Sequence, residues 1–549
     1  MQTEFPRPVP NRSVHAPRAE QWDGRWALLA LQAGAILVVL AATPYHFFQL
    51  DRYTFVKELV LLAVALAAVL LCLGSARTLT VFMVDALVAG FLALSLISAL
   101  LAANGWLAAR ALGVSLAGAG LFWAARTVAR KGHGPRLLGA LAIAVVLGAG
   151  TGLVQAYGLL TTDFASLTRA PGGTFGNRNF MAHLVTIGLP VLILVTVEAR
   201  RGGGFVLGAA GVALATAALV LSRSRAAWLG AAACGIFLAV EGLWVGRLWT
   251  DQRLRKRVLV LTGIGLGGLL LALALPNRLN WRSDSPYLDS LTGVANYREG
   301  SGRGRLIQYG NTLRMAGDHP VLGVGPGNWP LYYPKYMSPS DPSFAAGDVI
   351  PTNPWPSSDW MAMLAERGLP ASLFLLAVGG TIALGAWIRV RSGTRRAPAL
   401  GDLTIVATLI AIVVVGAFDA ALLLPVPTFF AWTVVGALAS SARPVREVVL
   451  TPLGRRRLTV AVGVVGGVLL LHSLAQVAAM ALSGGGSREA LERAARVDPG
   501  SYRIHMRLAQ EWRAADRCDL ARPHAERARD LFPNHPAPLV LLRACRRRG

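Results

Sequence analysis

About thirteen apolar runs divide the chain, and most approach the roughly 20 residues that a helix needs to cross the hydrocarbon core of a bilayer. Two runs are weaker, since Arg110 interrupts 107–125 and the run 426–441 is short. Backbone polar groups in lipid must bond within their own segment, which favours helices for runs of this length. The sequence therefore predicts an all-α polytopic membrane protein with about 12–13 transmembrane helices. The runs lie at 27–43, 59–75, 81–103, 107–125, 137–160, 180–199, 204–222, 226–246, 258–276, 369–388, 403–422, 426–441 and 459–482.

The composition supports a membrane protein. Apolar residues make up 54% of the 549 residues and charged residues 15%, whereas a soluble domain carries about 25% charged residues. These fractions exclude a cytosolic enzyme, a secreted disulfide scaffold and a disordered protein. The net charge of +25 falls largely in short loops between apolar runs rather than on one soluble face, so we expect no nucleic-acid partner.

The Arg and Lys residues predict the orientation, because cytoplasmic loops of membrane proteins are enriched in both. With the N-terminus in the cytoplasm, the short Arg-rich loops all fall on the cytoplasmic side. No signal-peptide cleavage site follows the run 27–43, which we expect to be the first membrane helix. The outer face then carries the loop 161–179 and two larger segments. The predicted domains are a cytoplasmic N-terminal segment at 1–25, a membrane domain at 26–482 with an outer insert at 277–368, and a small helical tail at 483–549.

The tail contains an internal repeat. The segment ALERAARVDP at 490–499 returns as HAERARDLFP at 524–533, and this spacing is typical of the tetratricopeptide repeat, a helix–turn–helix unit. A plain helical hairpin is the alternative. Fewer than two repeats are present, whereas a solenoid usually needs about three. We therefore expect the tail to lean on the membrane domain or on a protein partner.

The four cysteines form no CxxC motif, which excludes the usual zinc and redox patterns. Cys72 and Cys234 lie inside apolar runs and are expected to pack there. Cys518 and Cys545 lie in the tail and can pair if the tail occupies an oxidising compartment.

Two arginines stand out at the predicted outer boundary of the membrane. Arg223 and Arg225 lie in a tight turn between two apolar runs, opposite the Arg-rich loops, so the topology rule does not explain them. Two guanidiniums fixed at a membrane boundary suit a diphosphate, because the planar donor fork of Arg matches phosphate oxygens. Binding of lipid headgroups or capping of a helix end is the alternative.

The insert adds further candidates. Arg303 and Arg305 precede a helical segment, and the glycine-rich turn GVGPGN at 323–328 leads to Trp329. This turn lacks the GxxxxGK[ST] pattern of a nucleotide-binding loop, so we interpret it as a tight turn that shapes a cavity together with Trp329. His319 precedes a proline and is expected to be a turn residue more often than a base.

Polar side chains also precede two of the apolar runs. Asn177, Arg178 and Asn179 suit sugar hydroxyls and phosphate, with capping of the following helix as the alternative. Ser357 and Asp359 come before the run 369–388. Asp359 is a candidate general base, although a helix start also favours Asp for its charge.

These segments together resemble the O-antigen ligase and O-antigen polymerase superfamily of bacterial envelope proteins. The matching pieces are TFGNRNFMAHL at 174–184, SRAAWLG at 224–230, GRLIQYGNTLRMAGDHPVLGVGPGNW at 304–329 and SDWMAMLAERGLP at 358–370. The resemblance implies a C-type glycosyltransferase fold in the bacterial inner membrane, with a periplasmic active cavity among membrane lipids. It implies a donor glycan on undecaprenyl diphosphate, and an acceptor hydroxyl on lipid A core or on a second lipid-linked glycan.

The resemblance also implies roles for single residues. Arg225 and Arg305 match the two arginines that neutralise the diphosphate without a metal or cofactor, with Arg223 and Arg303 in support. The family's usual His at the start of the helix after the insert is replaced here by Ser357, which cannot act as a base at neutral pH. Three explanations stay open: Asp359 takes the proton, arginine clamping of the leaving group suffices, or the activity has changed.

Two other classes of function remain open at this point. A transporter of lipid-linked sugars would carry charges near the bilayer midplane and internal repeats between its halves, and Glu241 and Asp419 are the clear acidic candidates in the late helices. A non-catalytic assembly scaffold would use the tail to dock a protein partner or the growing polymer.

Overall fold

The computed structural model describes residues 24–43, 51–159, 170–244, 251–281, 283–293, 296, 298, 300–338, 341, 354–392 and 396–546. The predicted N-terminal segment 1–25 lies almost entirely outside these residues, as do residues 161–169 of the loop 161–179. The described chain is an all-α polytopic membrane protein, as the sequence predicted.

A helix occupies each of the predicted apolar runs. Among the described residues, nine helical stretches are long and apolar enough to cross a membrane, and α1 and α16 are shorter apolar helices. The weak run containing Arg110 forms α4, which continues into α5 through a π-helical turn at Ala129–His133. The helices of the membrane domain are α1 (Arg25–Leu40), α2 (Asp51–Ser75), α3 (Met83–Leu100), α4 (Gly105–Val128), α5 (Gly134–Ala156), α6 (Arg178–Val197), α7 (Gly202–Ser222), α8 (Arg225–Trp244), α10 (Gln252–Ala274), α14 (Asp359–Arg391), α15 (Arg396–Phe418), α16 (Pro425–Leu438) and α17 (Pro452–Ser483).

The helix α6 lies at the centre of the bundle. It contacts α5, α7, α8, α15 and α16, and its Met181, Leu184 and Ile187 are fully buried. In contrast, α17 leaves Val460, Val464 and neighbouring apolar side chains exposed. In a chain with this many apolar helices, such exposed faces are the surface that contacts lipid.

Several charged side chains inside the bundle have partners on neighbouring helices. Lys57 donates from Nζ to the carbonyl oxygens of Val38, Val39 and Ala41, at the C-terminal end of α1, at 2.7 to 3.1 Å. Such partners are what allows ionisable groups to lie within membrane helices. Ion pairs between membrane helices in the described residues join Arg110 to Glu58, Arg126 to Asp85, Arg389 to Asp402 and Arg391 to Glu241.

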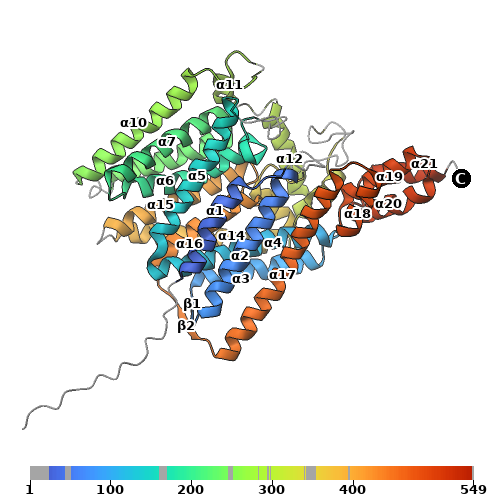
Figure 1. Ribbon diagram of the computed structural model, residues 1–549, viewed down its shortest axis with the longest axis horizontal. Helices are drawn as coiled ribbons and strands as arrows, with labels where there is room; N and C mark the ends of the chain where they lie inside the picture. The colour runs from blue at the N-terminus through green and yellow to red at the C-terminus, as the bar shows by residue number, and fades with distance from the viewer. Residues whose placement is uncertain are drawn as a thin grey trace, which may run out of the picture.

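A small β ribbon closes one end of the bundle. The strands β1 (Thr78–Val81) and β2 (Arg446–Val449) pair in antiparallel register, with Thr78 opposite Val449. We call this end the ribbon end. Figure 1 shows α17 running from the ribbon to the C-terminal helices, and we call the opposite end, where those helices lie, the tail end.

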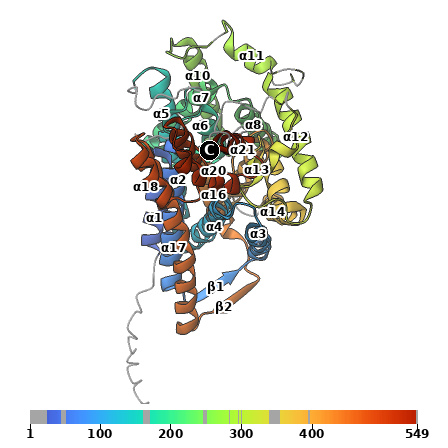
Figure 2. The ribbon, with the colours of Figure 1, turned by 90° about the vertical axis from the view of Figure 1, so that its right-hand side faces the viewer.

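The tail end carries the polar segments of the protein. Its short helices are α11 (Pro286–Thr292), α12 (Gly300–Asp318) and α13 (Trp329–Tyr332), and the C-terminal tail consists of α18 (Arg488–Val497), α19 (Tyr502–Ala514), α20 (Cys518–Leu531) and α21 (Pro536–Arg546). Figure 2 views the molecule from the side of this tail, which packs over the ends of the membrane helices. Asn104 donates from Nδ2 to the Leu531 carbonyl, and Asn534 donates to the Leu331 carbonyl. The tail therefore leans on the membrane domain, as expected.

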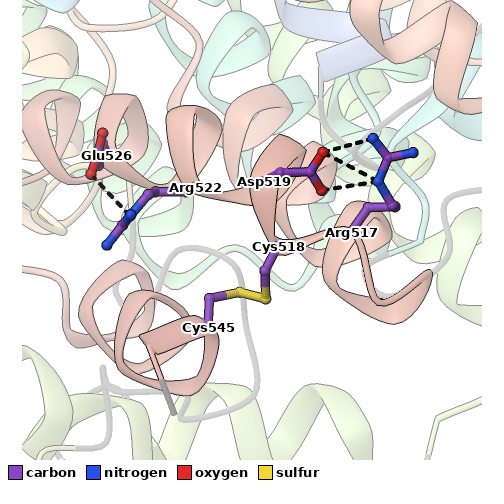
Figure 3. Close-up of a disulfide and its surroundings, with 6 residues drawn as sticks. All are labelled: Arg517, Cys518, Asp519, Arg522, Glu526 and Cys545. Carbon is purple, nitrogen blue, oxygen red and sulfur yellow. Dashed lines mark hydrogen bonds and ion pairs between the residues drawn. A yellow bond between two sulfur atoms is a disulfide. The ribbon is translucent and has the colours of Figure 1, made fainter. Parts of the chain in front are cut away.

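The two copies of the sequence repeat fall at the ends of α18 and α20. Each copy closes with a proline and is followed by one further helix, so the tail consists of two helix pairs. The assignment to tetratricopeptide repeats stays a prediction. A disulfide joins Cys518, at the start of α20, to Cys545 in α21 (Figure 3), whereas Cys72 and Cys234 are buried and unbonded.

Candidate functional site

The turn between α7 and α8 positions Arg223. The Ser222 hydroxyl accepts the Ser224 N–H at 3.2 Å, and Arg223 takes up a left-handed backbone conformation with φ 51°. Its guanidinium donates to Ser290 Oγ at 2.8 Å and lies 4.6 Å from the ring centroid of Trp281. The tight turn therefore directs Arg223 toward the segment before and within α11.

Two further guanidiniums face the same segment. Arg225, the first residue of α8, donates to the carbonyl oxygen of Gly293. Arg178, the first residue of α6, lies 5.0 Å from the centroid of Trp281. We call Arg178, Arg223 and Arg225 the arginine cluster. Three like charges at one helix-end surface create a positive potential that favours phosphate oxygens.

Several polar side chains gather at the start of α6 and one helical turn into it. Asn177 caps this helix by accepting the Asn179 N–H, and Asn179 donates from Nδ2 to Asp419 Oδ2 at 3.0 Å. His183 is fully buried, with Nε2 3.7 Å from the same carboxylate oxygen. The charge of Arg305 acts on His183. Arg305 is therefore a neighbour of this polar group.

The start of α12 docks on the segment before α14. Gln308 accepts the Ser357 N–H at 2.7 Å, and the Tyr309 hydroxyl lies 2.8 Å from the carbonyl oxygens of Ser357 and Ala417. These contacts fix the backbone of Ser357 and hold α12 near the end of α15. Arg305, one turn earlier in α12, is positioned by the same docking.

Asp359 is fully buried at the first position of α14. Its carboxylate accepts the backbone N–H groups of Ala421, Leu422 and Leu423 at distances of 2.8 to 3.3 Å. Both oxygens are therefore engaged by the connection between α15 and α16. This geometry suits an anchor between helices, whereas the cap of α14 is Ser358, whose hydroxyl accepts the Met361 N–H.

Three sequence candidates lie apart from the arginine cluster. Arg303 is exposed on α12. His319 lies after the end of α12 and meets the ring of Tyr332 edge-on at 5.6 Å. Trp329 is fully buried and donates from Nε1 to Thr312 Oγ1 at 3.0 Å. The indole is therefore part of the packing that holds α12 and α13 together.

Sequence reasoning did not bring His183 and Asp419 together as a site. They lie on α6 and just after α15, and the bond from Asn179 to Asp419 spans 240 residues. Each residue carried a weak signal alone, since a polar residue within or beside an apolar run is a functional candidate. No cluster of three or more metal-ligating side chains occurs within the described ranges.

A cavity of about 230 Å³ lies under the tail. Its walls come from the membrane helices α2, α4, α14 and α17 on one side and from the tail on the other. Trp355 and Leu422 also contribute, and the Trp355 ring packs 6.2 Å from that of Phe180, the neighbour of Asn179. The cavity therefore adjoins the polar group around Asp419.

Comparison with known proteins identifies one region of the chain. Residues 210–376 match the family model described as O-antigen ligase. This region contains Arg223, Arg225, Arg305 and Asp359, and it begins within α7 and ends within α14. No curated protein matches the chain. The family match supports glycosyl transfer of the ligase or polymerase type. The chain is thus a polytopic membrane protein whose residues 210–376 match the O-antigen ligase family model.

Proposed function

We propose that the protein transfers a glycan from undecaprenyl diphosphate to an acceptor sugar hydroxyl at the periplasmic face of a bacterial inner membrane. The observation that carries this proposal is the convergence of Arg178, Arg223 and Arg225 on one segment at the ends of membrane helices. Two of the three lie in the O-antigen ligase domain. The acceptor is lipid A core for a ligase, or a second lipid-linked glycan for a polymerase.

The arginine cluster supports binding and departure of the diphosphate. In the transfer, the acceptor oxygen forms a bond to the anomeric carbon while the bond from that carbon to the diphosphate oxygen breaks. The electron pair and the developing negative charge go to the diphosphate, where guanidiniums held in place stabilise them. Arg305 extends this positive surface toward His183. No metal has a part in the proposed step.

Asp419 is the carboxylate that we assign to the acceptor proton. Its side chain is 14% exposed, whereas Asp359 is fully buried under backbone N–H groups. A general base must reach the proton that it takes, which favours Asp419. Asp419 would thus take the role of the family's usual His, with Asn179 and His183 holding and polarising its carboxylate. Asp359 anchors the nearby backbone.

The proposed orientation has two supports. Arg446 pairs within the ribbon, the Arg77 carbonyl accepts the Leu450 N–H beside it, and Arg130 donates to the Ser440 and Ala442 carbonyls just before β2. Such a group of arginines at one end suits the cytoplasm. A disulfide joins two helices of the tail, and disulfides persist in oxidising compartments such as the periplasm.

Complementation of a deletion strain tests the function. We expect Arg225→Ala and the double variant of Arg223 and Arg225 to lose long or ligated envelope glycan on a gel. Asp419→Asn should reduce it strongly. Arg522→Ala is the matched control, because this exposed tail arginine pairs only loosely with Glu526 at 3.7 Å.

Expression of each variant is checked by immunoblot of the membrane fraction. Wild-type glycan in the double arginine variant would contradict the diphosphate clamp. A non-catalytic scaffold with the tail as docking unit would then be the better description, since such a protein keeps its phenotype without the arginines.

A further inference from the structure

The cavity under the tail is partly open and is lined by two parts of the chain. The membrane domain contributes Arg110, Ser115 and Arg367, and the tail contributes Tyr502 and Arg503. Its volume of about 230 Å³ is below the 300–1,000 Å³ of pockets for drug-sized ligands. A single ring fits such a space better than an oligosaccharide or a lipid chain.

Two buried polar side chains that line the cavity each have one atom without a hydrogen-bond partner among the described residues. Arg367 is 1% exposed, and its Nη1 donates to Ser95 and Ser115 hydroxyls at 3.3 and 2.9 Å. Its Nε has no hydrogen-bond partner among the described residues. The hydroxyl of Tyr502, which is 7% exposed, also lacks one there. Buried polar atoms without partners cost about 1–3 kcal/mol each, so a ligand whose hydroxyls reach these atoms after a small side-chain shift would offset that cost.

The formal charges of the described side chains that line the cavity sum to zero. The described lining holds three guanidiniums and three carboxylates, namely Arg110, Arg367, Arg503, Glu58, Glu366 and Asp498. Arg110 and Glu58 form a two-pronged pair at 2.6 and 2.7 Å. Glu366 accepts the N–H groups of Gly327 and Trp329 at 2.8 and 3.3 Å. With no net formal charge, the cavity offers directional donors and acceptors without favouring an anion or a cation.

Aromatic rings complete the lining. Phe55, Trp106, Trp355 and Phe532 line the cavity beside Tyr502. A lining that combines polar side chains with aromatic rings suits a pyranose ring, which presents hydroxyls at its edge and C–H groups on its faces. A fatty chain would leave the buried polar atoms unsatisfied.

We propose that this cavity binds one uncharged sugar ring of the acceptor glycan, so that tail and membrane domain together select the acceptor. The assignment to the acceptor rests on the proposed transfer reaction. It is supported by the contact of Trp355 with Phe180, because Phe180 follows Asn179, the residue that holds Asp419. The sugar-binding property itself rests on the cavity alone.

The binding test uses the purified full-length protein in lipid nanodiscs. The probes are methyl β-glucopyranoside, methyl β-galactopyranoside and N-acetylglucosamine as neutral sugars, with glucuronate and glucose 6-phosphate as charged ones. Saturation-transfer NMR measures weak binding of each. Tyr502→Phe removes only the unpartnered hydroxyl and should weaken neutral-sugar binding about tenfold, whereas Tyr336→Phe, whose hydroxyl bonds Asp318 outside the cavity, should not.

A second pair of variants tests occlusion. Ala111 lines the cavity and Ala109 on the same helix does not, so Ala111→Met should abolish binding and Ala109→Met should keep it. Binding of the charged probes alone would overturn the proposal in favour of an ionic ligand. Neutral-sugar binding unchanged in both cavity variants would place the sugar elsewhere, and no binding of any probe would make the cavity a structural one.

The transfer assay separates this proposal from the proposed function. Arg225→Ala should keep neutral-sugar binding while it loses transfer. Tyr502→Phe should raise the acceptor KM with kcat retained. If the wild type binds neutral sugars in the cavity and yet makes no glycan product, the glycosyltransferase proposal fails and the sugar site stands.

Discussion

Replacement of Asp359 by alanine distinguishes an anchoring carboxylate from a catalytic one. In the structure the carboxylate is fully buried and accepts three backbone N–H groups of the segment between α15 and α16. Alanine leaves these donors in a dry environment without an acceptor. It also removes a negative charge from the first turn of α14, where the helix dipole favours one.

The expected magnitude follows from those bonds. Each buried donor left without a partner costs about 1–3 kcal/mol, so three cost about 3–9 kcal/mol. We expect the lower part of this range, about 3–5 kcal/mol, because the bond from Leu423 is already long at 3.3 Å. Asp359→Asn keeps one acceptor oxygen but turns an amide N–H₂ toward N–H groups, and we expect about 1–3 kcal/mol.

The assay measures stability and turnover on the same samples. Thermal unfolding in nanodiscs gives the stability, and transfer is normalised to folded protein from size-exclusion chromatography. Asp318→Ala is the control, because this exposed carboxylate accepts one hydrogen bond, from Tyr336 at 2.8 Å, and should change stability by at most about 0.5 kcal/mol. If Asp359→Ala melts with the wild type but no longer transfers glycan, the anchoring argument is refuted and Asp359 becomes the base.

Three further predictions concern the tail and α14. Burial, reinforced by His524, lowers the pKa of His505 to about 4 from an ordinary 6.5. Between these values the unfolded chain binds a proton that the folded tail does not, so stability falls by about 2 kcal/mol from pH 7.5 to 5. Hydrogen exchange of α19 and α20 should show this loss, and His505→Asn should flatten it; equal pH dependence in both proteins would count against it. Cys518→Ser opens a loop of 27 residues and should cost about 3.5 kcal/mol by chain entropy, measured by protease sensitivity of the tail. Alkylation of both tail thiols in unreduced cells would refute the disulfide. Gly368→Ala should cost about 3 kcal/mol or more in thermal unfolding, because φ is +79° and a Cβ would lie 2.2 Å from a carbonyl oxygen. Gly380→Ala in the same helix meets nothing within 4 Å and should be neutral; equal melting of the two would contradict this.

The membrane helices could be predicted from the sequence because their signal is local. Twenty or so apolar residues leave the backbone no other structure in lipid, so even the run interrupted by Arg110 forms a helix. The partner that makes Arg110 tolerable, Glu58, lies on another helix and carried no signal of its own. In the same way β1 and β2 are four-residue strands, too short to be recognised before their pairing is known.

Site residues could be predicted from the sequence where their side chains were unusual for their position in the membrane topology. Arg223 and Arg225 are such residues, because guanidiniums at an outer boundary have no topological explanation. The neighbourhood of Asp419 and His183 was not predictable, since it depends on how α6 and α15 pack. Trp329 and Asp359 were singled out from the sequence, but the structure shows both of them in packing or backbone contacts. The sequence looks the same whether such an aromatic or acidic residue holds the fold or contacts a substrate.

The pairing of β1 with β2 also constrains how the protein is made. The two strands are roughly 370 residues apart in the chain, and α17, which packs on α2, is synthesised later still. At translation rates of about 5–20 residues per second, the first helices must remain inserted for about 20–70 s before their last partners emerge. The early helices α1 to α4 therefore depend on one another, or on the insertion machinery, throughout that interval, and substitutions that weaken the contacts of α1 with α2 should lower yield during biogenesis more than they lower stability of the finished protein.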